Sequence, residues 1–169
     1  MVLLAAAAAI MISGSRPAGP EPASEGNGTV SSTFSGKVDY DTYFTGERLR
    51  IDLTFAGNAT SQNAYLNGLA CEARWAGSPA SLIDPFGYGQ YYFEAFADGA
   101  LIFSKGFSTL FEEWRTTEEA ARVAKAASQT VWMPFPKEKI HIVLYQRIRA
   151  TGRFEEFFEW DIDPMDRHI

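Results

Sequence analysis

Strict alternation of apolar and polar residues is the feature that most constrains how this chain can fold. In residues 49–55 every second side chain is apolar, which predicts a strand with one face on a core and the other in water. Residues 140–145 and 154–162 alternate in the same way, and the aromatic-rich residues 91–96 are typical of a more central strand. We expect further strands at residues 65–75, 100–107 and 130–135.

Turn residues separate these segments and complete the fold prediction. Asp98-Gly99 lies between two alternating runs and predicts a hairpin, because both residues tolerate positive φ. A single helix is expected where Thr116 and Glu119 match a capping box and the Ala-rich residues 120–127 follow. The sequence therefore predicts an all-β fold, an antiparallel β-sandwich of about seven or eight strands with one short surface helix.

Size and charge limit the classes of partner. The 169 residues correspond to about one domain, and the single cysteine, Cys71, excludes an internal disulfide. The formal net charge of -6 argues against nucleic acid and anionic membranes as partners.

The N-terminal 36 residues differ in composition from the rest. Val2–Ile12 is an unbroken apolar run that would rise only about 16 Å as a helix, so we expect no membrane span. Ser13-Gly14-Ser15 follows, which predicts a signal peptide at residues 1–15 and a secreted or periplasmic protein, although no Lys or Arg precedes the run. An Ala-rich tail or a mis-assigned start is the alternative.

The next segment, residues 16–36, is rich in Gly, Pro and Ser, and we expect a flexible linker there. Asn27 and Asn58 each begin a glycosylation acceptor tripeptide. Tripeptides this short arise by chance, so the sequence favours no sugar at either position.

The chain offers few groups for catalysis. A catalytic zinc takes three protein ligands, whereas this sequence has one cysteine and two distant histidines, His141 and His168, with no H-E-x-x-H helix. His141 is the one plausible base for a serine triad, but no G-x-S-x-G element accompanies it. Cys71 lies in an expected strand, which favours an inert buried thiol. We therefore predict no catalytic residue, no cofactor and no metal ligand.

Acidic residues give only weak site candidates. The pairs Glu112-Glu113, Glu118-Glu119 and Glu155-Glu156 are interpreted as solvated surface charge, because neighbours on a strand point to opposite faces. Three further aspartates have a spacing loosely like that of a calcium loop, without its Gly and distal Glu: Asp161, Asp163 and Asp166. Whether they bind calcium stays open at this point.

Aromatic residues are the better candidates for binding. They form either a stacking platform for sugars or proteins, or part of the sandwich core, and in a chain of this size the core is favoured. The residues concerned are Trp75, Trp114, Trp132, Tyr88, Tyr91 and Tyr92.

Several strings, taken in order and spacing, resemble one known family. They are Tyr40-Asp41-x-Tyr43-Phe44-Thr45-Gly46-x-x-Leu49-Arg50, Trp75-Ala76-Gly77-Ser78, Leu82-Ile83-Asp84, Gly89-x-Tyr91-x-Phe93-Glu94, Ser104-x-Gly106-Phe107-x-x-Leu110-Phe111-x-Glu113-Trp114-x-Thr116-Thr117-x-Glu119-Ala120, Pro134-x-Pro136, Arg153-Phe154 and Asp161-Ile162-Asp163-Pro164. Over residues 37–165 the chain resembles the N-terminal domain of the M64 family, the IgA-type zinc metallopeptidases of gut and environmental bacteria.

The resemblance implies a non-catalytic accessory domain of a secreted peptidase. The zinc ligands of such enzymes belong to a second domain, so none of the family's catalytic residues has a counterpart here, and residues 166–169 are interpreted as the start of a linker. The implied partners are a downstream catalytic domain and a protein or glycan substrate. We predict the interface at Trp114, Thr116 and Thr117, with Trp75 as a further candidate. The alternative is a stand-alone extracellular module that binds glycans or proteins.

Overall fold

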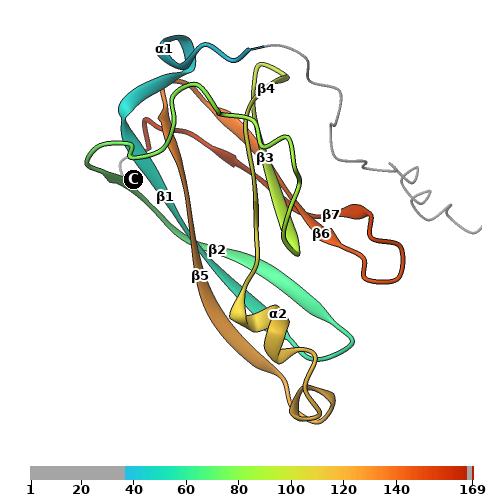
Figure 1. Cartoon of the computed structure of the whole chain (residues 1–169). Coiled ribbons are helices and arrows are strands. Elements are labelled where there is room, and N and C mark those ends of the chain that lie inside the picture. The colour runs from blue at the N-terminus through green and yellow to red at the C-terminus, as the bar shows by residue number, and fades with distance from the viewer. Residues whose placement is uncertain (1–36, 167–168) are drawn as a thin grey trace, which may run out of the picture.

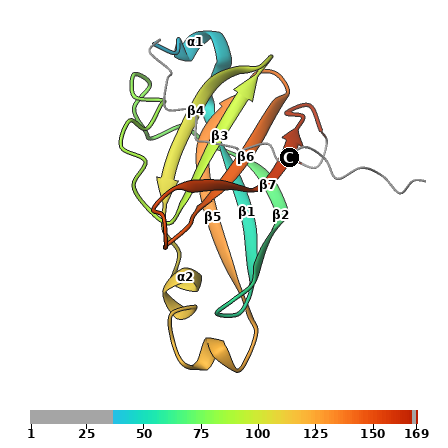
Figure 2. The same cartoon turned by 90° about the vertical axis from the view of Figure 1, so that its right-hand side faces the viewer.

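The alternating segments form seven strands in two antiparallel sheets, as Figures 1 and 2 show. The computed structural model describes residues 37–166 and 169. The expected signal peptide and linker, and also Asn27 and His168, lie outside these residues. The elements are α1 (Tyr40–Tyr43), β1 (Phe44–Gly57), β2 (Gln62–Glu72), β3 (Tyr91–Ala97), β4 (Ala100–Phe107), α2 (Leu110–Trp114), the 3₁₀ helix η1 (Glu119–Ala121), β5 (Lys125–Pro136), β6 (Ile140–Arg147) and β7 (Phe154–Ile162). The predicted all-β sandwich is confirmed.

Antiparallel pairing joins neighbouring strands within each sheet. One sheet has the order β2-β1-β5 and the other β4-β3-β6-β7, and the paired strands are antiparallel. The β3–β4 hairpin turns at Asp98 and Gly99, with φ of 47° and 76°, so the hairpin predicted from this dipeptide is confirmed.

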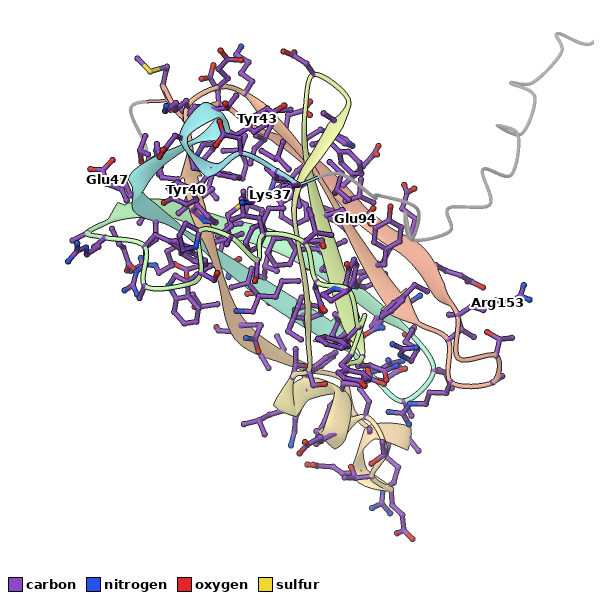
Figure 3. The ribbon with its side chains drawn as sticks, turned by 45° about the horizontal axis from the view of Figure 1, so that its top comes forward. Lys37, Tyr40, Tyr43, Glu47, Glu94 and Arg153 are labelled. Carbon is purple, nitrogen blue, oxygen red and sulfur yellow. The ribbon has the colours of Figure 1, made fainter. Side chains whose placement is uncertain are left out.

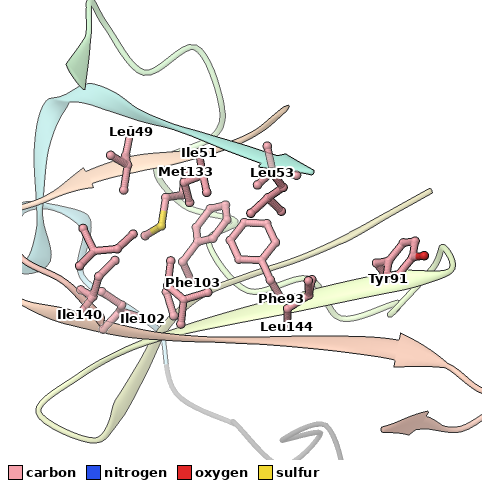
Figure 4. Close-up of a cluster of buried hydrophobic side chains, with 14 of the residues drawn as sticks. Leu49, Ile51, Leu53, Tyr91, Phe93, Ile102, Phe103, Met133, Ile140 and Leu144 are labelled. Atoms are coloured by element: carbon pink, nitrogen blue, oxygen red, sulfur yellow. The ribbon is translucent and has the colours of Figure 1, made fainter. Parts of the chain in front are cut away.

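The core lies between the two sheets (Figure 4). Leu49, Ile51, Leu53 and Phe55 alternate along β1 and are at most 1% exposed, which is the half-buried strand that the alternation predicts. Phe93, Leu144 and other inner-face residues of the second sheet pack against them. Burying one such large side chain stabilises the fold by about 2 kcal/mol before entropy is counted.

The helix prediction at residues 116–127 is wrong. The capping-box region forms only η1, and the following Ala-rich run enters β5, where Lys125, Ala126 and Ala127 pair with Gly57, Ala56 and Phe55 of β1. Backbone pairing with β1 overrides a helix preference that amounts to a few tenths of a kcal/mol per residue. The α-helices instead lie at Tyr40–Tyr43 and Leu110–Trp114.

The sandwich has two distinct ends. At the α1 end, Lys137 N–H donates to Tyr43 O at 2.9 Å and Ile140 pairs with Ile162, so the first and last described elements meet at the β5–β6 turn. The β1–β2 turn, α2 and the β6–β7 turn lie at the opposite end (Figure 1). Figure 3 shows Arg153 on the β6–β7 hairpin, far from Tyr43 on α1.

Candidate functional site

Of the predicted interface residues, Trp75 lies apart from the other three. Trp75 follows β2, and its backbone N–H donates to Gly46 O at 2.9 Å near the start of β1. Its ring packs edge-on against Phe103 with centroids 6.0 Å apart, and its buried Nε1 has no hydrogen-bond partner within the described residues. Trp114 ends α2 at the opposite end of the sandwich.

Trp114, Thr116 and Thr117 stabilise their own segment. The Trp114 ring packs on Phe111 at 5.6 Å, and its Nε1 donates to Glu119 Oε2 at 2.9 Å. Thr116 Oγ1 donates to the backbone oxygen of Glu113 at 2.7 Å, and Thr117 Oγ1 accepts from Ala120 N–H at 3.4 Å. These contacts end α2 and begin η1, so the three residues support the position of α2.

The α2 end of the sandwich contains a polar cleft of about 430 Å³, which lies within the usual range of ~300–1,000 Å³ for ligand sites. Three connections form it: the β1–β2 turn, α2 with the residue that follows it, and the β6–β7 turn. Its lining residues are Ala59, Thr60, Ser61, Gln62, Gln90, Glu112, Arg115, Gln146, Arg147, Ile148 and Arg149. Only two of them are apolar, so the cleft suits a polar ligand.

Glu112 is the charged centre of this cleft. Its side chain is buried on the first turn of α2, where Thr109 Oγ1 caps the helix by accepting from Glu112 N–H at 3.0 Å. Arg115 Nη1 donates to Glu112 Oε2 at 2.8 Å, and Arg149 Nη2 donates to Glu112 Oε1 at 2.6 Å. The interpretation of this glutamate as solvated surface charge is therefore wrong, because α2 turns it inward instead of leaving it on a strand face.

Two arginines tie the connections together. Arg115 Nε donates to Asn58 O at 2.8 Å, which fixes α2 to the β1–β2 turn. Arg147 Nε donates to Gly89 O at 2.9 Å and its Nη1 to Gly152 O at 2.7 Å, which fixes the segment before β3 to the β6–β7 turn. Asn58 Oδ1 accepts from Thr60 and Ser61 N–H at 2.9 Å, so the asparagine of this tripeptide holds the turn.

Tyr91 links the cleft to the core. Its hydroxyl lies 2.6 Å from Gln62 Oε1 and 3.2 Å from Glu112 Oε2. Burial raises the pKa of Tyr91 above its ordinary value, and the Glu112 carboxylate raises it further. Tyr91 therefore acts as a neutral hydrogen-bond donor at physiological pH.

Of the three tyrosines considered as a platform, only Tyr88 is exposed. Tyr91 and Tyr92 are buried, whereas Tyr88 and Phe86 are 74% and 70% exposed and stack on each other with centroids 5.5 Å apart and planes 8° apart. Trp132, at 38% exposed, lies on the outer face of β5 beneath Arg48. Tyr88 of this exposed pair is among the aromatic residues that the sequence offers, whereas Phe86 is not.

The two residues considered for catalysis, His141 and Cys71, do not line the polar cleft. His141 is half-exposed, with Nδ1 2.8 Å from Asp161 Oδ1 and Nε2 3.4 Å from Glu159 Oε2. Cys71 is exposed, so the predicted buried thiol is wrong: it lies near the end of β2, an edge strand with a free side.

The possible calcium ligands have protein partners. Asp163 pairs with Lys139 at 3.1 Å and accepts from Met165 N–H at 3.0 Å, and Asp161 faces His141. Within residues 37–166, no group of three or more His, Cys, Asp and Glu side chains, Asp166 included, is arranged to hold a metal ion. None of the helices in this part of the chain has the length and apolar character that a membrane crossing requires.

Sequence reasoning missed the cleft itself. Its residues come from segments as far apart as Thr60 and Arg149, and only strand pairing brings them together. A local signal is Arg147-x-Arg149 at the end of β6, a pair of cations in a chain whose net charge is -6.

Comparison with known proteins identifies the family of this chain. The family model described as Peptidase M64 N-terminus matches residues 39–159, which confirms the resemblance found in the sequence. No curated protein matches the chain.

Proposed function

Because the chain belongs to the peptidase M64 N-terminal family, we propose that it is a non-catalytic accessory domain of a secreted or periplasmic zinc peptidase. In this proposal the zinc-binding catalytic domain is separate from these residues. The role of the domain is to engage the peptidase's substrate through the polar cleft at the α2 end.

The position of the cleft is the observation that carries this proposal. The described chain begins and ends at the α1 end, where α1, the β5–β6 turn and the end of β7 meet. A domain joined there in sequence would attach at the α1 end, which lies opposite α2 (Figure 2), whereas the cleft is at the α2 end. The cleft is then free to face substrate, which favours substrate engagement over docking between domains.

The surroundings of His141 support a non-catalytic role. Both of its ring nitrogens face carboxylates, at 2.8 and 3.4 Å. A histidine in a hydrolytic triad instead presents one ring nitrogen to a hydroxyl or thiol nucleophile. The Glu112 carboxylate is likewise paired with two arginines, Arg115 and Arg149, which supports a structural role for it.

Peptide hydrolysis tests the proposal directly. The purified chain with added zinc should hydrolyse casein no faster than buffer does. A catalytic domain of the same family should cleave a protein substrate at a lower KM when it is fused to this chain than when it is alone. Turnover by the isolated chain would contradict the non-catalytic role, and an unchanged KM in the fusion would contradict substrate engagement.

A second candidate is a stand-alone extracellular module that binds glycans or proteins. The exposed stacked pair Phe86 and Tyr88 favours it, because soluble domains seldom leave two adjacent rings in water without a ligand or partner. The reading frame downstream of the Ile169 codon separates the two candidates. A frame that encodes H-E-x-x-H favours the accessory domain, and an immediate stop codon favours the free module.

A further inference from the structure

The geometry points to an acidic saccharide, a sugar that carries a carboxylate, as the ligand of the polar cleft. This names the class of substrate group for the substrate-engaging role proposed above, and its biological meaning rests on that role.

Charge is the first reason. Three guanidinium groups and one carboxylate are the charged side chains that line the cleft, so it is positive in a chain whose net charge is -6. A positive recess in a negative surface attracts anions selectively, and the attraction weakens as salt is added.

Arg149 has the free donors that an anion needs. Its side chain is 54% exposed, and Nη2 bonds to Glu112. Its Nε and Nη1 make no hydrogen bond to the residues that the structure describes, whereas Arg115 and Arg147 are committed to backbone carbonyls. A guanidinium that is positioned by one carboxylate and still has open N–H groups can bind a second one.

Amide groups provide the complement for sugar hydroxyls. Gln62 Oε1 accepts from Tyr91 and its Nε2 donates to Gln146 Oε1 at 2.5 Å, which fixes the Gln146 amide in place. Gln146 Nε2 and Gln90 Oε1 then have no partner among residues 37–166, one as a donor and one as an acceptor. Hydroxyl groups both donate and accept, so a saccharide satisfies both amides at once.

An exposed aromatic pair lies on the segment that leads into Gln90. Phe86 and Tyr88 precede Gln90, and Arg147 holds the backbone oxygens of both Gly87 and Gly89. Arg147 also lines the cleft, so one side chain contacts both the cleft and the backbone of the segment that carries the aromatic pair. The C–H face of a pyranose ring is a suitable partner for such a ring surface.

These observations favour a saccharide over a peptide. A peptide ligand would place side chains in apolar subsites, and Ala59 and Ile148 are the apolar residues of this cleft. A sugar acid instead uses the guanidinium, the two amides and the aromatic surface together.

Calorimetric titration of the full chain tests the assignment. The probes are a uronic-acid oligosaccharide, its carboxyl-reduced neutral form and an oligoglutamate peptide of similar charge. We expect the uronic oligosaccharide to bind, the reduced form to bind at least tenfold more weakly, and the peptide to bind no better than the reduced form. Added salt should weaken the first interaction.

Matched variants locate the site. Arg149→Gln should weaken binding of the uronic oligosaccharide at least tenfold and Tyr88→Ala about fivefold. Arg153→Gln, an exposed arginine on the same hairpin that does not line the cleft, should change the affinity less than twofold. Circular dichroism spectra of the variants show that each one folds.

Three results would overturn the assignment. They are no binding at millimolar uronic oligosaccharide, binding of the carboxyl-reduced form as tight as that of the uronic form, and binding of oligoglutamate that is tighter than that of the saccharide and is abolished by Arg149→Gln. The last result would identify a peptide site. Binding of the saccharide without any effect on KM in the fused peptidase would leave the ligand class standing and contradict the proposed function alone.

Discussion

Among single residues, Glu112 has the greatest influence on the α2 end. Its carboxylate accepts hydrogen bonds from Arg115 and Arg149, which come from two different connections, and Tyr91 OH lies 3.2 Å from it. Removing one partner of a buried ion pair costs more than the pair contributes, because the remaining charge stays desolvated. Glu112 is therefore expected to matter for stability as well as for the shape of the cleft.

Glu112→Ala should lower the free energy of unfolding by about 3 kcal/mol, because Arg115 is left buried without a counter-charge. Urea denaturation measures the change. Lys139→Gln is the matched control, since the Lys139–Asp163 pair is largely in water and its loss should leave the midpoint nearly unchanged. Equal effects of the two substitutions would contradict the structural role of Glu112.

Cys71 is accessible but should react slowly. Partial burial raises the pKa of its thiol, and the neighbouring Glu47 carboxylate raises it further. A raised pKa means less thiolate at a given pH, and the thiolate is the reactive form. The pH at which iodoacetamide labelling reaches half its maximal rate should therefore be higher than for an ordinary cysteine.

The variant Glu47→Gln tests the cause of this shift. It should move the labelling profile to lower pH and speed the reaction at pH 8, because one of the groups that disfavours the thiolate is gone. A profile that stays in place would show that Glu47 has no effect on the thiol.

Among the elements, α2 depends most on a single side chain. The helix has only five residues, and its N-cap is Thr109, whose Oγ1 accepts from Glu112 N–H at 3.0 Å. A helix this short has no stability of its own, so the cap and the packing of Phe111 hold it in place.

Thr109→Ala should destabilise the protein by about 1 kcal/mol more than Thr109→Ser, because serine keeps the capping hydroxyl. Thermal denaturation of the two variants measures the difference, and both lose the same methyl group. Indistinguishable midpoints would mean that the cap contributes nothing to α2.

How far the elements follow from sequence depends on how local their causes are. The strands whose apolar and polar residues alternate are predictable because that pattern lies within each strand, as in Leu49, Ile51 and Leu53 of β1. The helix prediction at residues 116–127 failed because the pairing of Ala127 with Phe55 is not visible locally. The cleft escaped prediction for the same reason, since Gln62 and Arg149 are neighbours only after three connections have packed together.

The segment between β2 and β3 is held against β4 at a close backbone approach. Gly106 N–H donates to Asp84 Oδ2 at 3.0 Å, and a Cβ at Gly106 would lie 1.8 Å from Tyr88 O. Because that neighbour is backbone, it cannot rotate away. The approach fixes the backbone of Tyr88, on the segment that carries the exposed aromatic pair.

Gly106→Ala should cost about 2–3 kcal/mol of stability, because the segment that holds Tyr88 must shift. Gly46→Ala is the control, since a Cβ there meets nothing within 4 Å and the stability should stay level or rise slightly. Chemical denaturation compares the two variants. A Gly106→Ala protein as stable as Gly46→Ala would contradict the close approach.

At the scale of the whole molecule, one core joins the two ends. At one end Trp75 packs on Phe103, and at the other Trp114 packs on Phe111, which in turn contacts Phe55 of β1. All of these side chains belong to the same hydrophobic cluster or pack against it. The α2 end is therefore part of the sandwich and not a separate folding unit, although its cleft is polar.

This continuity predicts a single unfolding transition reported by probes at both ends. The described residues contain Trp75, Trp114, Trp132 and Trp160, so replacing three with Phe gives variants that keep only Trp75 or only Trp114. In each variant, the fluorescence midpoint in urea should coincide with that variant's own midpoint by far-UV circular dichroism, because one core loses its packing in one step. An earlier fluorescence transition confined to the Trp114 variant would show that the α2 end opens independently and would contradict the single core.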